Sequence, residues 1–151
     1  MALVMTSGPA AEPVTVAEAK AHLRIDHDAE DVLIGSLILT SRLHIEAALG
    51  LALIAQGWRL VLDRWPKGAT IAMPLAPVIG LGEIRVRDAS GAASVLAPGD
   101  YALDAAGREP RIIRRATYWP EPGRAAAGIE IGFTAGFGAT AADVPEPIRH
   151  A

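Results

Sequence analysis

Apolar residues recur at helical spacing in the first third of the chain. Between Val32 and Leu49 they fall three or four positions apart, the period of an α-helix. Acidic residues crowd positions 28–31, where a helix dipole favours negative charge, and Gly50 suits a left-handed stop. The pattern predicts a helix of about 20 residues. It also places Leu37 on the buried face, so that Leu37→Asp would bury an unpaired charge and unfold the helical body.

A shorter helix is predicted ahead of it. Thr15 and Glu18 have the spacing of a capping box, in which each side chain bonds the backbone amide of the other residue. The helix continues to about Leu23. The preceding residues 1–14 contain Pro9 and Pro13 and are predicted to form an extended arm.

Beyond residue 55 the pattern changes to short alternating runs typical of strands. Turns are predicted at 88–91 and 104–107, both of the form Asp-x-x-Gly, so that successive strands form a meander. Six or so strands at this spacing favour a small antiparallel sheet or barrel. The runs are 58–63, 71–73, 84–87, 94–96, 101–103, 111–114 and 129–134.

The last residues read as the beginning of a helix. Pro145, Glu146 and Pro147 are all residues that a first helical turn accepts. We therefore expect the natural protein to continue past Ala151. The predicted fold is α+β, with a helical body built from 1–54 and a truncated helix in 139–151, and a β-rich insertion at 55–138.

The composition of the chain excludes several classes of protein and kinds of site. The chain is 51% hydrophobic and can bury a core, and it has no run approaching the roughly 20 apolar residues of a membrane span and no basic signal-peptide region. Without cysteine it has no disulfide, thiolate nucleophile or Cys-based metal site. The net charge of −3 argues against nucleic-acid binding, although a protein that merely lines a DNA path could carry it.

No pattern of catalytic or ligand-binding residues stands out. The acidic cluster at 26–31 lacks the turn glycine and distal glutamate of a calcium loop. The histidines lack zinc-site spacing, and the serines lie in no nucleophile motif. The basic stretch is a phosphate-facing patch or a solvated strand face, and it comprises Arg108, Arg111, Arg114, Arg115 and Arg124. We predict no enzyme, cofactor or metal site.

The order of these signals carries a resemblance. The segment 12–24, the acidic start at 28–31, the long helix, 53–58 and the Trp65-Pro66 break follow one another along the chain. Phe133-Thr134-Ala135-Gly136-Phe137-Gly138 then precedes Val144-Pro145-Glu146-Pro147-Ile148-Arg149. The chain in this respect resembles the head–tail connector, or adaptor, proteins of tailed phages, especially those of prophages and gene transfer agents.

The resemblance implies a structural role. Such proteins form a ring of about a dozen subunits with closed symmetry. The ring joins the portal of the capsid to the stopper or tail terminator, and packaged DNA passes through it without sequence-specific binding. The implied location is the neck of the particle, after assembly in the bacterial cytoplasm and without a membrane. The implied partner-binding residues are Pro145, Pro147, Ile148 and Arg149.

One alternative stays open at this stage. A small β-rich binding module without catalytic activity would place Trp58, Tyr101 and Trp119 together on an exposed face, where they would bind a peptide, a sugar or nucleic acid. A closed ring distinguishes the connector from this alternative.

Overall fold

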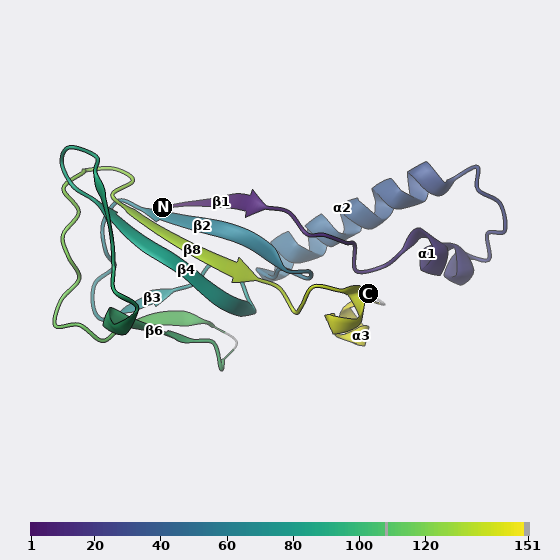
Figure 1. Cartoon of the computed structure of the whole chain (residues 1–151). Coiled ribbons are helices and arrows are strands. Elements are labelled where there is room, and N and C mark those ends of the chain that lie inside the picture. The colour runs from purple at the N-terminus through teal and green to yellow at the C-terminus, as the bar shows by residue number, and fades with distance from the viewer. Residues whose placement is uncertain (108, 150–151) are drawn as a thin grey trace.

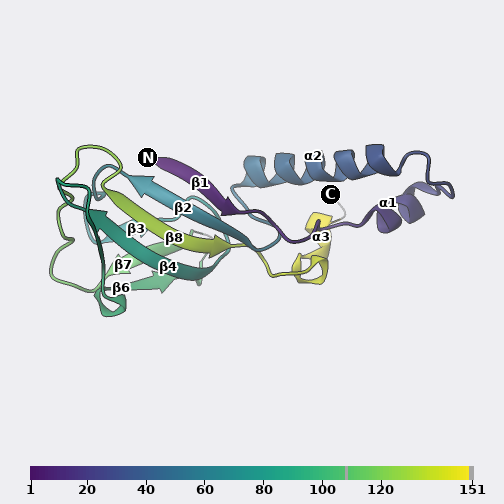
Figure 2. The same cartoon turned by 45° about the horizontal axis from the view of Figure 1, so that its top comes forward.

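A computed structural model describes residues 1–107 and 109–149 of the protein. The molecule has two lobes, with the sheets at one end and the helices at the other (Figure 1). A rotated view shows the same separation, with the strands β1 and β8 running toward the helical lobe and β2 running away from it (Figure 2). The mixed α+β class expected from the sequence is confirmed.

The larger sheet has five antiparallel strands in the order β1-β2-β8-β4-β5. Its strands are β1 (Ala2–Ser7), β2 (Gln56–Leu62), β8 (Ile129–Ala135), β4 (Val78–Arg87) and β5 (Ala93–Val95). The predicted extended arm thus contributes a strand, because residues 2–7 pair with β2 along its length. The predicted turn at 88–91 joins β4 to β5 as a hairpin.

The smaller sheet has three antiparallel strands in the order β3-β7-β6. They are β3 (Thr70–Ala72), β7 (Arg111–Arg114) and β6 (Tyr101–Asp104), with the short 3-10 helix η1 (Pro98–Asp100) ahead of β6. Residues from both sheets share one core, including Leu60, Ile84, Ile112 and Ile131. The barrel expectation is wrong: over the described residues the strands form two separate sheets that share this core.

The aromatic residues of the binding-module alternative are not gathered on an exposed face. Tyr101 and Trp119 are buried in the core between the sheets, and Trp58 is half-buried against it. Trp119 stacks on Trp65 with ring centroids 4.5 Å apart. These side chains serve the core, which removes the feature on which the binding module depended.

The two predicted helices of the front segment are confirmed. The helix α1 (Val16–Leu23) has the capping box of Thr15 and Glu18, and α2 (Asp31–Leu49) ends at Gly50, whose φ of 64° is left-handed. Lys20 bonds both Asp28 and Asp31, so the acidic cluster fastens α1 to the start of α2. This bonding to Asp28, the larger cause, and to Asp31 raises the pKa of Lys20.

A second, smaller core joins the lobes. Leu53 and Ile54 follow α2 and are buried with Val144, and Phe137 and Ile148 pack against them. The C-terminal part turns here through η2 (Ala141–Asp143) into the short helix α3 (Glu146–Arg149). Gly136 leaves β8 with a φ of 143°, and a Cβ there would lie 2.5 Å from the Ala55 amide nitrogen. The positive φ and this close approach both require glycine at position 136.

Candidate functional site

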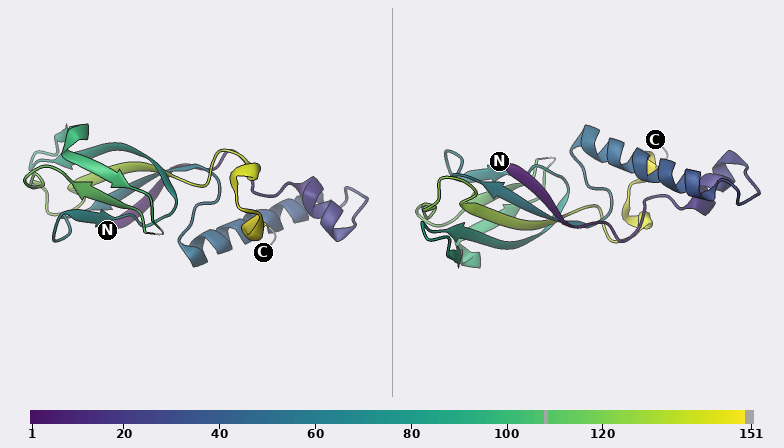
Figure 3. Two further views of the ribbon diagram at one scale, coloured as in Figure 1. Left: turned by 90° about the horizontal axis from the view of Figure 1, so that it is seen from below. Right: turned by 90° about the horizontal axis from the view of Figure 1, so that it is seen from above.

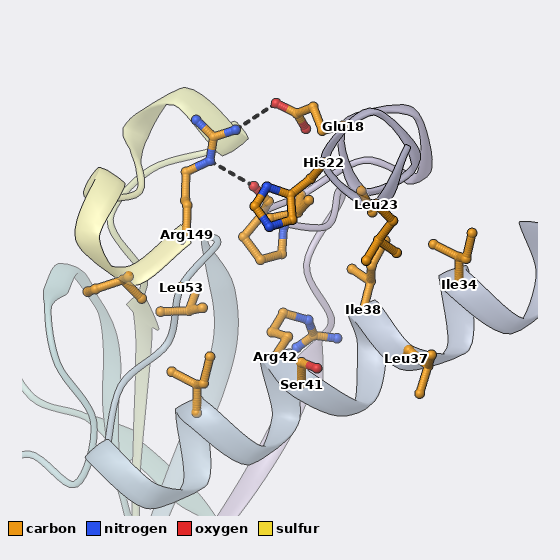
Figure 4. A pocket seen from close by; sticks show the side chains of 15 residues that line it. Glu18, His22, Leu23, Ile34, Leu37, Ile38, Ser41, Arg42, Leu53 and Arg149 are labelled. Atoms are coloured by element: carbon orange, nitrogen blue, oxygen red, sulfur yellow. Dashed lines mark hydrogen bonds and ion pairs between the residues drawn. The ribbon is translucent and has the colours of Figure 1, made fainter. Parts of the chain in front are cut away.

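A groove lies in the helical lobe, bounded by α1, α2 and α3. It encloses about 620 Å³. Figure 4 shows side chains from α1, α2 and the C-terminal segment converging on it. Its apolar lining residues include Leu23, Ile34, Leu37, Ile38, Ile45 and Ile148. A groove of this size and lining is suited to binding apolar side chains.

Arg149 closes one end of the groove. Its Nε donates to the carbonyl of Pro13 at 3.0 Å, and its Nη2 donates to Glu18 Oε1 at 2.7 Å, as drawn in Figure 4. Glu18 also accepts from the Thr15 amide at 2.8 Å. The Thr15 bonds, first of all the backbone one, and the Arg149 charge hold the pKa of Glu18 below its ordinary value. Glu18 therefore links the N-terminal cap of α1 to the C-terminal α3.

A buried ionic network lies beside the groove. Arg42 donates from Nε to Glu12 at 2.8 Å and from Nη1 to Glu46 at 2.8 Å. Glu46 also accepts from the Leu53 amide at 2.8 Å and from the Gln56 side chain at 2.7 Å. Burial alone would lower the pKa of Arg42, but the bonds to Glu12 and Glu46 outweigh it and raise that pKa. This network fastens α2 to the arm and to the beginning of β2.

The expected buried face of α2 needs correction. Leu37 is 57% exposed, and Val32 and Leu49 are exposed as well, while the buried positions of the helix are Ile34, Arg42 and Glu46. The helix turns its two paired charges inward and much of its apolar surface outward. The spacing of Arg42 and Glu46, four positions apart, was the available sequence signal for this inward-facing pair.

The predicted partner-binding residues lie together on and just before α3. Pro145 and Pro147 are exposed, whereas Ile148 and Arg149 are half-buried. Ile148 packs against the second core, and Arg149 makes the bonds to Pro13 and Glu18. Two of the four residues thus hold α3 in place, and the two prolines are free to contact another molecule.

Two further polar regions carry ion pairs. In the predicted basic stretch, Arg111 pairs with Asp104 at 3.0 Å, and Arg108 lies outside the described residues. A smaller depression on the five-stranded sheet contains Arg59, Arg85, Glu83 and Glu130, and their charges are paired. Within 1–107 and 109–149, no group of three or more His, Asp or Glu side chains is placed to hold a metal ion.

Comparison with known proteins identifies the fold with a particular class of assembly protein. Residues 13–73 match the family model of the phage gp6-like head–tail connector proteins. No curated protein matches the chain significantly.

Solved structures match almost the whole chain. A chain in the virion of a native gene transfer agent particle is 33% identical, with a TM-score of 0.84, over 96% of this chain and 76% of that one. A chain in the neck of the empty particle, computed with C6 symmetry, is 33% identical over the same shares, with a TM-score of 0.83. A chain in the neck of the native particle, computed with C12 symmetry, is 34% identical over 96% and 75%, with a TM-score of 0.79.

The chain belongs to the phage gp6-like head–tail connector family. Its role is that of a head–tail connector, and the role is structural and not catalytic.

Proposed function

We propose that this connector is one subunit of a ring in the neck of a tailed phage or gene transfer agent particle. The ring joins the portal of the capsid to the stopper or tail terminator. The observation that carries the proposal is the 34% identity, over 96% of the chain, to a chain in a neck computed with C12 symmetry. That symmetry favours twelve copies, each making the same contacts with its two neighbours.

The two lobes are assigned to different partners of the ring. The helical lobe supplies the groove and α3, which Figure 3 shows beside α2 when the molecule is viewed from below or above. We assign the portal contact to the exposed prolines Pro145 and Pro147, with Ile148 and Arg149 holding the segment in position. The sheet lobe is then left for contact with the stopper or tail terminator.

The charge of the subunit suits a DNA channel. A net charge of −3 gives packaged DNA little to bind, because contacts to phosphate from Lys and Arg dominate DNA affinity. The DNA therefore passes through the ring without sequence-specific binding. We place the mature protein in the neck of the particle and its assembly in the bacterial cytoplasm.

A ring of subunits would account for the hydrophobicity of α2. The expectation that no run approaches a membrane span needs correction, because among the helices of the described residues α2 is long and apolar enough, by length and composition, to cross a membrane. Its C-terminal half carries the paired Arg42 and Glu46, and charged side chains are costly inside a bilayer. We attribute its apolar surface to contact with protein and not to membrane insertion.

Electron microscopy tests the proposal. The full chain is mixed with the portal protein of the same particle, and the product is imaged by negative stain. A ring stacked coaxially on the portal is expected. A monomer that ignores the portal at every concentration would contradict the proposal.

The portal contact needs its own variant. Pro145→Ala with Pro147→Ala should weaken portal binding, while Pro98→Ala, an exposed proline in the sheet lobe, should leave it unchanged. If the parent, the double variant and the Pro98→Ala control bound the portal equally well, the two prolines would not be part of the portal contact.

A further inference from the structure

The outward side of α2 carries a continuous uncharged stripe. Its members are spaced four, three, four and four positions apart, so they follow one line along the helix. All are exposed, and we call them the outer seam: Val32, Ser36, Leu39, Leu43 and Ala47. Leu33 lies beside the seam and is also exposed, whereas Leu37 lines the groove.

The seam avoids every charge of the helix. Between Asp31 and the end of α2 the charged residues are Arg42 and Glu46, and both are buried and paired on the inward side. Covering the seam with protein would therefore desolvate no ion. A soluble protein whose helix turns charges inward and leucines outward has an apolar surface shaped for a partner.

The same lobe carries a second apolar surface. The groove between α1, α2 and α3 is concave, and the charges of Glu18 and Arg149 at its end are paired with each other. A cyclic ring requires two different surfaces that fit each other, one on each side of the subunit. The seam and the groove are such a pair, because one protrudes, the other is hollow, and both belong to the helical lobe.

The area of the exposed apolar surface indicates how many contacts are needed. Four large side chains on or beside the seam are 42–87% exposed, namely Val32, Leu33, Leu39 and Leu43. At about 100 Å² for each fully exposed side chain, they present roughly 230 Å². A stable interface buries about 800 Å² on each partner. One such contact is insufficient for a stable dimer, whereas a closed ring gives every subunit two.

We propose that the outer seam of one copy packs into the groove of the next copy, and that this contact closes the connector ring. The inference rests on the proposed function, because it assigns the neighbour within that ring. Leu39 and Leu43 are the central side chains of the seam, and Leu23 and Ile38 belong to the receiving wall.

A charge placed on the seam tests the contact. Leu43→Glu should fold with an unchanged melting temperature, since Leu43 is 48% exposed, but rings on the portal should be lost. The matched control is Val95→Glu on β5, the edge strand of the five-stranded sheet, where the side chain is 54% exposed. The control should form rings as the parent does. Rings formed equally by Leu43→Glu would overturn the proposal.

Cross-linking identifies the occupant of the groove. Because the chain has no cysteine, Leu43→Cys and Leu23→Cys each introduce a unique thiol. In oxidised rings, mixing the two single variants should give covalent dimers, and the double variant should give a ladder of multimers. Each variant alone should stay monomeric on a denaturing gel, since the two surfaces differ. Dimers of Leu43→Cys alone, or its cross-linking to the portal only, would overturn the seam-in-groove contact.

The two proposals fail in different ways. If the parent forms rings on the portal but the mixed cysteines never join, the ring function stands and the seam-in-groove contact is wrong. If the parent forms no ring with the portal, the ring function is wrong and this inference falls with it.

Discussion

At the scale of single residues, the buried pair of Arg42 and Glu46 explains the orientation of α2. Glu46 accepts three hydrogen bonds, from Arg42, the Leu53 amide and Gln56. Breaking a buried pair leaves an uncompensated charge, which is the reason such pairs resist rotation of the helix. The network thereby fixes which side of α2 faces outward.

Removing the Glu46 carboxylate should strongly destabilise the fold. Glu46→Ala leaves the Leu53 amide and the Gln56 side chain without their acceptor and leaves Arg42 with Glu12 as its remaining partner, so we expect a loss of about 3 kcal/mol in the free energy of unfolding. Urea denaturation measures it. Asp104→Ala removes the carboxylate of the more exposed pair with Arg111 and should cost under about 1 kcal/mol. Equal effects of the two changes would show that the network does not hold α2.

Leu37 now has a different expected phenotype. Leu37→Asp should keep the fold and lower the free energy of unfolding by no more than about 1 kcal/mol, because the side chain is exposed. Ile34→Asp, one turn earlier on the buried face, should unfold the helical lobe. A thermal melt distinguishes the two, and a Leu37→Asp protein as unstable as Ile34→Asp would restore the face expected from the sequence.

The ends of the helices could be predicted from the sequence, whereas the buried face of α2 could not. The Thr15–Glu18 cap and the Gly50 stop depend on residues a few positions apart, so their spacing was sufficient. Which side of α2 is buried depends on Glu12, Leu53 and Gln56, which the helix meets only in the folded chain. Apolar residues surround most of α2, so their period alone does not determine which side of the helix is buried.

At the scale of elements, α1 is loosely packed. None of its residues is buried, and it is held by its cap, by Lys20 and by the Glu18–Arg149 pair. Such an element opens locally at a lower free energy than the core strands.

Loss of the α1 cap should act locally. Thr15→Ala removes the side-chain acceptor for the Glu18 amide and should destabilise α1 by about 1 kcal/mol. Amide exchange in residues 16–23 should become about fivefold faster, while β2 and β8 stay protected. Thr140→Ala, which removes the matching cap of η2, should leave α1 unchanged. Faster exchange throughout the molecule would show that α1 is not a separate local unit.

Acid should release α1 before the sheets. The pKa of Glu18 lies below its ordinary value of 4.5, so its contribution is complete above about pH 4.5 and is lost as the pH falls through the folded-state value. Asp28 behaves alike, because bonding to Lys20 lowers its pKa. Amide exchange at pH 3 should rise first in α1. The Glu18→Gln variant should lose part of this pH dependence, and an unchanged profile would exclude Glu18 as its source.

The element predictions succeeded where a pattern was strong. Seven of the strands correspond to predicted alternating runs, because alternation and turns are local properties. The strand β1 was expected only as an extended arm, since it becomes a strand by pairing with β2, more than 50 positions away. The split into two sheets was also hidden, because it depends on which strands meet and not on where they begin.

At the scale of the whole molecule, the two lobes are joined by a small core around Leu53, Ile54 and Val144. The sequence order of a helical front, a strand-rich middle and a helical end was enough to suggest the connector family. The groove required the structure, because it combines residues of α1, α2 and α3, which the sequence separates. The outer seam lies on α2 alone, but its outward orientation depends on the contacts of Arg42 and Glu46 with distant residues.

A reconstruction of the particle neck at a resolution that shows α2 would test the proposed ring and its seam-in-groove contact most directly. We expect this subunit to be repeated around the axis of the portal, with the outer seam of each copy, centred on Leu39 and Leu43, covered by the groove of the next. A neck in which this subunit is absent, or in which the seam faces solvent, would contradict it.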